Sequence, residues 1–588
     1  MSAQADDPML VPRPIGTTKY NNVPYSMRSI SFVRHYRWIG LVEPFPLARR
    51  LALLLYLCVP KKNHSVQSFR PTTMQKGNHG MSAPTTNSTI YQALREVSKR
   101  QPDKVALIFN GREYTYDELV KRIDGVADKL AVLGISKGDA VAVFSQNRPE
   151  FLFCYFATAK LGGIFVPLNF NLTTAEVEYI LDHSEAKLLF HDEHVADLKA
   201  LNLPEGTSHR IEDLADLSGV DSSAGQVDID IDEDLLIAYT SGSTGQPKAV
   251  ALSNRAQLNA AASFKEMFGL SPEDTTVLGA PLGFLLGLST ISMVSLLAGA
   301  KVVVNRRFHP AEILDALIKH KATLFHGVPT MFSMMLEYAE QQNARYDLSQ
   351  MRALICSGSP LLDELRKRFK DRFGKDLQNY FGMTECYPVF GRRSDDPVEP
   401  PGGSVGKLAP GAAVRVLDEN GRDCPKGTHG ELLLKAPSMV KRYHKDPELT
   451  AASYADGWFK TGDIGYEDEQ GYVYITGRIK DLIRRGGANV APVEIENVLL
   501  KHPDVLSAAV VGVPDRIFAE VPVAYVVKKD DSPLTGEELI TFASQSLAKF
   551  KLPATVYFEA KLPLGKTGKI DKKALRAIWD EAAAAQPA

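Results

Sequence analysis

Short apolar runs alternate with segments of helical periodicity along the chain from about Thr89. The runs Val105–Phe109, Ala140–Phe144 and 163–167 predict strands, because each is brief, apolar and bounded by turn residues. Residues 115–133, which open on the capping box Thr115-x-x-Glu118, and residues 150–160 predict helices. Strands that alternate with helices in this way are typical of a mostly parallel sheet covered by helices.

The alternation resumes in the second half of the chain and then changes character twice. Residues 301–304 and 322–326 predict strands, with a helix over 310–320 between them. From about Val405 the segments are short strands joined by glycine-rich turns, at 413–417, 431–434 and 472–475, which predict a small β-rich subdomain. From Lys480 onward we expect helices over 492–501, 536–547 and 572–583 and strands over 507–511 and 521–527.

These segments predict an α/β protein of two domains preceded by an extension. A large N-terminal domain, residues 88–479, combines helix-covered sheets with the β-rich subdomain. A small α+β domain follows over residues 480–588, and residues 1–87 are a basic extension of uncertain role.

Charge separates the extension from the rest of the chain. Residues 1–80 carry eleven Lys and Arg against three Asp and Glu, whereas the remainder is acidic, with 57 basic against 67 acidic residues. An acidic body is unsuited to nucleic acids, which bind basic surfaces. The apolar run 51–59 in the extension has nine residues, far short of the roughly twenty that span a bilayer. The extension therefore allows organelle targeting, peripheral membrane contact, or translation from Met81 without it, and we otherwise expect a cytoplasmic protein.

The five cysteines are odd in number and contain no C-x-x-C pair. This pattern is typical of a reducing compartment and indicates no structural zinc. The chain also lacks an H-E-x-x-H motif, which argues against a zinc hydrolase.

Residues 239–248, with the sequence Tyr-Thr-Ser-Gly-Ser-Thr-Gly-Gln-Pro-Lys, are the most informative run in the chain. They follow the apolar strand expected at 234–238, so small residues, hydroxyls and a lysine meet at the end of a strand. Backbone N–H groups of such a loop can surround a phosphate, although a flexible Gly/Ser turn would have the same composition. The spacing differs from a Walker A loop. The candidate phosphate ligands are Thr240, Ser241, Gly242, Ser243, Thr244, Gly245 and Lys248.

Four later segments carry side chains suited to the rest of a nucleotide. The run 381–385 ends in Thr384 and Glu385, which together can hold Mg²⁺ beside a triphosphate or can simply cap a helix. Asp463, after a glycine turn, can accept hydrogen bonds from ribose hydroxyls or close the turn. Residues 477–487 supply a cationic group and a glycine pair that is also compatible with a hairpin tip, and 563–569 supply lysines on a loop.

Taken in order, these motifs resemble the adenylate-forming superfamily of acyl-CoA synthetases, firefly-type luciferases and peptide-synthetase adenylation domains. The resemblance covers about residues 88–576. The matching runs are 239–248, 355–360, 381–385, 461–463, 477–496 and 565–569.

The resemblance implies a mobile C-terminal lid that pivots at Lys480 and a role for each motif. Glu385 and Thr244 would bind Mg²⁺, and Lys569 would act on the substrate carboxylate and the α-phosphate. Gly486 and Gly487 would line the channel for coenzyme A. The remaining implied ATP and AMP contacts are Gly358, Ser359, Pro360, Phe381, Gly382, Met383, Thr384, Asp463 and Arg478.

The implied acid pocket is apolar. Its walls are residues 283–289 and 326–330, which include Phe284, Gly287, His326 and Gly327. They lack the aspartate that amino-acid-activating relatives use, so we expect an apolar fatty or aromatic acid. Many relatives have Pro-Leu-Phe-His where this chain has Pro281-Leu-Gly-Phe284, a difference that bears on the choice of acid.

Three functions are compatible with these residues. The first is an acid–CoA ligase that uses ATP, Mg²⁺ and coenzyme A. The second is a ligase that loads the acyl group onto an acyl carrier protein. The third, a binding protein without activity, is disfavoured because Glu385, Asp463, Arg478 and Lys569 are all present.

Overall fold

The computed structural model describes residues 88–193, 201, 203–215, 227–240, 247–565 and 569–584. The extension of residues 1–87, with the predictions attached to it, lies outside the described residues. In the described part of the chain, no helix combines the length and apolar content that crossing a bilayer requires.

A seven-stranded sheet contains the second and third predicted strands, β3 and β4, in the order β18-β8-β7-β4-β3-β5-β6. Its central strands are parallel, as the sequence predicts, whereas β8 runs antiparallel to both β7 and β18 at one edge. The strands are β3 (Ala140–Phe144), β4 (Ile164–Leu168), β5 (Ala186–His191), β6 (Ser208–Arg210), β7 (Asp234–Thr240), β8 (Lys248–Ser253) and β18 (Arg442–Tyr443).

A nine-stranded sheet has the order β15-β14-β13-β12-β11-β9-β10-β1-β2. At its β1–β2 edge, Asn110 and Gly111 both have positive φ, which is the hairpin-turn geometry that an Asn-Gly pair favours. The strands are β1 (Val105–Phe109), β2 (Arg112–Thr115), β9 (Thr275–Leu278), β10 (Lys301–Val304), β11 (Leu324–Gly327), β12 (Ala353–Cys356), β13 (Leu377–Met383), β14 (Cys386–Gly391) and β15 (Lys407–Leu408).

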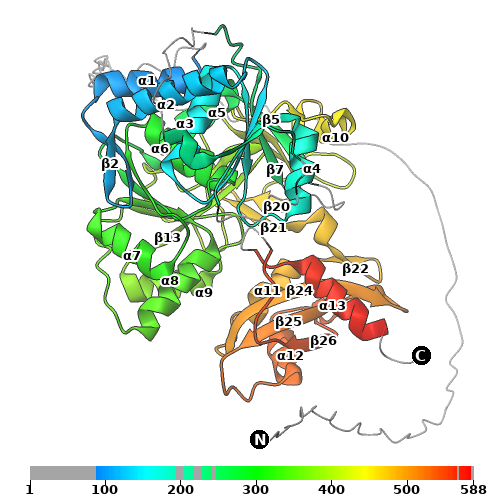
Figure 1. Ribbon diagram of the computed structural model, residues 1–588. Coiled ribbons are helices and arrows are strands. Elements are labelled where there is room, and N and C mark those ends of the chain that lie inside the picture. The colour runs from blue at the N-terminus through cyan, green and yellow to red at the C-terminus, as the bar shows by residue number, and fades with distance from the viewer. Residues whose placement is uncertain are drawn as a thin grey trace, which may run out of the picture. The chain divides into compact units, whose positions relative to one another are not determined.

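Helices cover both faces of both sheets, because alternate strand residues point to opposite faces. Leu107 packs into the core between the sheets, whereas its neighbour Ile108 packs against the helices on the outer face. Figure 1 shows α7, α8 and α9 together on one side of the nine-stranded sheet, with α1, α2 and α3 on the other. These helices are α1 (Ile90–Arg100), α2 (Tyr116–Val132), α3 (Pro149–Lys160), α4 (Thr174–Ser184), α5 (Asn254–Phe268), α6 (Val294–Leu297), α7 (Pro310–Lys319), α8 (Pro329–Gln341) and α9 (Asp363–Phe373).

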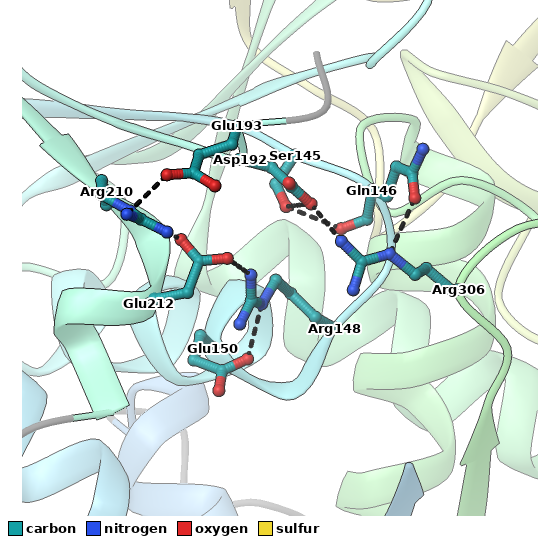
Figure 2. Close-up of polar contacts among 9 residues, drawn as sticks. All are labelled: Ser145, Gln146, Arg148, Glu150, Asp192, Glu193, Arg210, Glu212 and Arg306. Atoms are coloured by element: carbon teal, nitrogen blue, oxygen red, sulfur yellow. Dashed lines mark hydrogen bonds and ion pairs between the residues drawn. The ribbon is translucent and has the colours of Figure 1, made fainter. Parts of the chain in front are cut away.

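An ion network joins the two sheets beyond the ends of their strands (Figure 2). Arg306, which follows β10, donates to Asp192, which follows β5, at 2.8 Å. Arg148 at the start of α3 pairs with Glu150 and with Glu212 of the short helix η2 (Ile211–Ala215). These charges bind one another, so we regard the network as structural.

The predicted β-rich subdomain is present as a five-stranded antiparallel sheet. Leu432 and Leu434 of this sheet pack on Val389 and Phe390 of β14. Its elements are β16 (Ala413–Leu417), β17 (Gly430–Lys435), β19 (Tyr454–Ala455), β20 (Trp458–Glu467) and β21 (Val473–Arg478), with helix α10 (Pro447–Ala452) nearby in the chain.

The C-terminal part has its own sheet and core, which agrees with the expected α+β unit. Two helices end earlier than predicted: α11 stops at Leu499, just before Pro503 would interrupt it, and α12 stops at Ser544. The elements are β22 (Ile483–Arg485), β23 (Ala488–Val490), α11 (Pro492–Leu499), β24 (Val505–Asp515), β25 (Ala519–Lys528), α12 (Gly536–Ser544), η5 (Lys549–Lys551), β26 (Thr555–Phe558) and α13 (Lys572–Ala584).

Candidate active site

The candidate phosphate loop connects two antiparallel strands. Thr240 at the end of β7 lies opposite Lys248 at the start of β8. The residues between them that carry the phosphate prediction, Ser241, Gly242, Ser243, Thr244 and Gly245, lie outside the described residues. The hairpin nevertheless fixes the backbone of Lys248, whose ammonium nitrogen lies 5.4 Å from the centre of the Tyr443 ring.

Glu385 lies in the turn between β13 and β14, not at a helix terminus. The structure therefore excludes the helix-cap alternative for this carboxylate. Its Oε1 accepts a 2.7 Å hydrogen bond from the Tyr443 hydroxyl, and its backbone carbonyl accepts from the Val440 N–H at 2.9 Å. Among the described residues, no hydrogen bond or ion pair involves Oε2, which leaves that oxygen available to a ligand.

Residues 381–384 complete the segment before Glu385. The Phe381 ring lies 5.7 Å from the Phe390 ring, centre to centre, and is half-buried. Gly382 is tightly packed, since a Cβ there would lie 2.7 Å from the Tyr380 hydroxyl. Met383 and Thr384, like Phe381, are partly accessible.

Asp463 is 1% exposed, and in the part of the chain that the structure describes only one of its two carboxylate oxygens has a hydrogen-bond partner. Oδ1 accepts from Arg478 Nε at 2.7 Å, because the two residues lie opposite each other on β20 and β21. Burial raises the pKa of Asp463, and the charge of Arg478 opposes that rise. Oδ2 is buried and unbonded among the described residues, which is costly unless a ligand donates to it.

Lys569 lies next to this pair. Removal from water, together with the charges of Arg478 and Lys480, lowers the pKa of Lys569, although the residue retains exposed surface. Its Cε would lie 3.8 Å from a Cβ placed on Gly358, which has a φ of +83°. The structure thus brings Lys569, Asp463, Arg478 and Gly358 together from two parts of the chain.

The motif that contains Gly358 follows β12. Ser359 and Pro360 continue the loop beside it, before α9 begins. Ser357, which lies in the matching run 355–360 but was not among the predicted site residues, is buried, and its hydroxyl oxygen lies 2.7 Å from His326 Nε2.

The Ser357 side chain holds His326, whose Nδ1 has no hydrogen-bond partner among the described residues. Burial lowers its pKa to about 3, so its imidazole is neutral at physiological pH. Its ring stacks on Phe264 at 6.1 Å, and Gly327 follows it at the end of β11.

The other expected wall of the acid pocket begins with a close backbone approach. A Cβ on Gly283 would lie 2.4 Å from the Leu168 carbonyl oxygen, and one on Gly287 would lie 2.3 Å from that of Pro281. Gly287 belongs to a π-helical segment, η3 (Leu286–Met293), which the sequence did not predict. Phe284 precedes this segment and is half-buried.

Gly486 and Gly487 form the tip of the β22–β23 hairpin, with φ of +56° and +86°. This local geometry accounts for both glycines without a ligand. Among the described residues, no hydrogen bond joins them to the Asp463 group, and Gly486 donates to the Phe518 carbonyl. Lys480 lies in the short helix η4 (Ile479–Asp481), between the β-rich subdomain and β22.

Tyr443 is the main site residue that sequence reasoning missed. It lies 58 residues from Glu385 in the sequence, and the run from Val440 to Tyr443 contains no motif spacing that would have identified it. The structure identifies Tyr443, because the pairing of β18 with β8 places this residue at the site.

Comparison with known proteins gives two family matches. Residues 94–444 match the AMP-binding enzyme family, and residues 494–569 match the AMP-binding enzyme C-terminal domain. The first match alone covers more than half of the chain.

The alignment of this chain with individual relatives covers nearly the whole length of those relatives. A feruloyl-CoA synthase from Amycolatopsis sp is 34% identical over 480 residues, 82% of this chain and 96% of that protein. An indoleacetate–CoA ligase from Aromatoleum aromaticum is 33% identical over 81% of this chain and 96% of that protein. The crystal structure of ATP-bound MatB from Rhodopseudomonas palustris is similar with a TM-score of 0.77 and 30% identity, over 84% of this chain and 99% of that one.

Proposed function

Because the chain belongs to the AMP-binding enzyme family and is an AMP-forming acid–CoA ligase, we propose that it activates an apolar carboxylic acid, aromatic or aliphatic, as its acyl-adenylate. Aromatic acids are the first to test, since the feruloyl and indoleacetate relatives take aromatic acids by name. A carrier-protein acceptor has no support, because these relatives are named as CoA ligases.

The observation that carries the proposal is the buried carboxylate of Asp463. Its unbonded Oδ2 is suited to accept from the ribose hydroxyls of ATP, and its partner Arg478 is suited to a phosphate. A cation, Lys569, lies beside this pair, where the α-phosphate of a nucleotide held by Asp463 would come. Phe381 and the loop of Gly358, Ser359 and Pro360 would frame the adenine, with Gly382, Met383 and Thr384 alongside.

In the first half-reaction the substrate carboxylate oxygen attacks the α-phosphorus, and pyrophosphate leaves. Negative charge accumulates on the phosphates during this step, so fixed cations and backbone N–H groups provide the main stabilisation. Lys569 would hold the attacking carboxylate and an α-phosphate oxygen. Lys248, with Thr240 and the loop after it, would hold the departing β- and γ-phosphates.

The residues present fit a magnesium ion at Glu385. Its Oε2 is free among the described residues, and Mg²⁺ is bound by one or two carboxylates together with substrate phosphates. We propose that Glu385 and Thr244 hold the ion, which would neutralise triphosphate charge. The Tyr443 hydroxyl would keep Glu385 oriented toward it.

In the second half-reaction the thiol of coenzyme A attacks the acyl carbon, and AMP leaves. A water-free channel and a different arrangement of side chains suit this step better than the first. We propose that the lid turns at Lys480 and brings the Gly486–Gly487 hairpin to the channel. The absence of side chains at the tip would admit the pantetheine arm.

The proposed acid pocket is lined by Phe284 and Gly287 on one side and by His326 and Gly327 on the other. A neutral, buried His326 adds no charge that would pair with a second carboxylate on the substrate. These walls favour a flat or unbranched apolar group.

The test is an exchange assay between labelled pyrophosphate and ATP across aromatic, short-chain and long-chain acids, followed by detection of the CoA thioester. We expect exchange and thioester formation with at least one apolar acid. Exchange that is absent with every apolar acid but strong with a dicarboxylic or amino acid would contradict the proposed substrate class.

A further inference from the structure

The segment Val440–Tyr443, which we term the clamp segment, binds two separate parts of the proposed ATP site. At its first residue, the Val440 N–H donates to the Glu385 carbonyl at 2.9 Å. At its last residue, the Tyr443 hydroxyl donates to Glu385 Oε1 at 2.7 Å. The turn that carries Glu385 is therefore held through both its backbone and its side chain.

The same tyrosine contacts the strand that carries Lys248. In the β18–β8 ladder Tyr443 lies opposite Val250, two residues beyond Lys248. The Lys248 ammonium group lies 5.4 Å from the centre of the Tyr443 ring, a distance at which a cation is attracted to the ring face. One side chain thus lies between the lysine of the phosphate hairpin and the carboxylate of the β13–β14 turn.

Tyr443 has little freedom to leave this position. It is 3% exposed, and its backbone N–H donates to Thr450 Oγ1 at 3.0 Å. Because its ring is buried and its backbone is paired on β18, its hydroxyl is held toward its acceptor, Glu385 Oε1.

We propose that Tyr443 is a positioning residue for the magnesium–ATP complex, which it serves by fixing the orientation of Glu385. The inference rests on the proposed role of Glu385 as the magnesium ligand. A glutamate in a turn has several rotamers, and a hydrogen bond to Oε1 selects those in which Oε2 remains free. The Tyr443 hydroxyl donates a hydrogen bond to Oε1 and leaves Oε2 for the ion.

The experiment measures ATP binding by calorimetry in the presence and absence of Mg²⁺, with no acid present, so that no turnover occurs. Tyr443→Phe keeps the ring under Lys248 and removes only the hydroxyl. Since a hydrogen bond to a charged group is involved, we expect the gain in ATP affinity that Mg²⁺ provides to fall about tenfold. ATP affinity without Mg²⁺ should not change.

The matched control is Tyr454→Phe. Tyr454 is a half-buried tyrosine whose hydroxyl donates to the Val440 carbonyl, so it belongs to the same region, but within the described part of the chain no hydrogen bond joins it to Glu385. This variant should resemble the wild type in both measurements. An equal effect of the two substitutions would overturn the proposal, because it would show a general loosening of the clamp segment.

Two further variants separate this inference from the function it rests on. Glu385→Asp keeps the charge, but its shorter side chain moves the carboxylate away from the Tyr443 hydroxyl. The gain in ATP affinity that Mg²⁺ provides should therefore fall by the same factor in this variant, which makes the test independent of whether Tyr443→Phe folds well. In a Glu385→Gln background, Tyr443→Phe should have no further effect on the magnesium dependence. If Glu385→Gln itself binds magnesium–ATP normally, the metal assignment is wrong and the proposal falls with it. If Glu385→Gln loses the magnesium-dependent affinity but Tyr443→Phe and Glu385→Asp keep it, the positioning role alone is overturned.

Discussion

The carboxyl group of Asp463 is buried, has Arg478 as an ion-pair partner and has one oxygen that is unbonded among the residues that the structure describes. A carboxylate in this state destabilises the folded protein unless a ligand completes it. The position is therefore one where stability and nucleotide binding should respond to substitution in opposite ways.

We predict that Asp463→Asn lowers AMP affinity about tenfold or more without lowering the melting temperature. The pKa of Asp463 in the folded protein is higher than its ordinary value. The folded state therefore loses stability as the pH rises from the ordinary pKa through the pKa in the folded protein, because the buried carboxyl group ionises less readily than it does in the unfolded chain. Asp463→Asn cannot ionise and so does not lose this stability. The wild type should therefore become less stable than the variant, in relative terms, as the pH rises between the two pKa values. Calorimetry of AMP binding and thermal denaturation at several pH values measure both effects, and a large fall in melting temperature at neutral pH would contradict the prediction.

Lys569 is the residue whose loss should separate the two half-reactions. We predict that Lys569→Ala slows pyrophosphate exchange about 10²- to 10³-fold, because the substitution removes the cation that we propose acts at the reacting phosphate. Thioester formation from supplied acyl-adenylate and coenzyme A should stay near the wild-type rate. Equal losses in both assays would exclude a role confined to the first step.

At the residue scale, sequence motifs identified which side chains are available but not how they pair. The Asp463–Arg478 contact depends on the register of β20 and β21, which no local pattern encodes. Tyr443 escaped prediction for the same reason, since its partners come from distant segments of the chain.

At the scale of elements, the Gly486–Gly487 hairpin can be tested against a hairpin of similar geometry elsewhere. Gly487 and Gly421 both have positive φ, at +86° and +75°, and a Cβ on either would meet no atom within 4 Å. We predict that Gly487→Ala and Gly421→Ala each cost about 1 kcal/mol of unfolding free energy. Only Gly487→Ala should also slow thioester formation while pyrophosphate exchange continues; equal thioester rates in the two variants would count against the channel assignment.

Element boundaries were predictable where a local signal exists. The capping box at Thr115 and Glu118 starts α2, and Asn110–Gly111 turns β1 into β2, as the sequence indicates. The π-helical segment η3 has no comparable signal, because its shape follows from tight packing around Gly283 and Gly287. Strand β18 is only two residues long and depends on its partner β8.

At the scale of the whole molecule, the proposed mechanism requires the C-terminal domain to move about Lys480. We predict that Lys480→Pro preserves pyrophosphate exchange but lowers thioester formation about tenfold or more, because proline fixes φ at the proposed pivot. Lys480→Ala, which removes the charge without restricting the backbone, is the control and should retain the larger part of both activities. A proline variant as fast as the alanine variant in thioester formation would place the pivot elsewhere.

The class of the two-sheet architecture was predictable, but the order of the strands within each sheet was not. Alternating strands and helices indicate covered parallel sheets, and α3 is buried along almost its whole length, as a helix between two sheets must be. The order of strands, with β1 and β2 beside β10 in one sheet and β3 to β8 in the other, arises from long-range pairing. That pairing also decides which loops meet at the site.

The β7–β8 hairpin has a further consequence for how this protein attracts its nucleotide. In P-loop enzymes a helix begins directly after the phosphate loop, and its N-terminal dipole supplies part of the positive potential. Here β8 begins at Lys248, and α5 does not start until Asn254. Without a helix end directly after the loop, a larger share of the attraction would come from ionic side chains and bound cations, so nucleotide affinity should depend more steeply on ionic strength than it does where a helix end contributes.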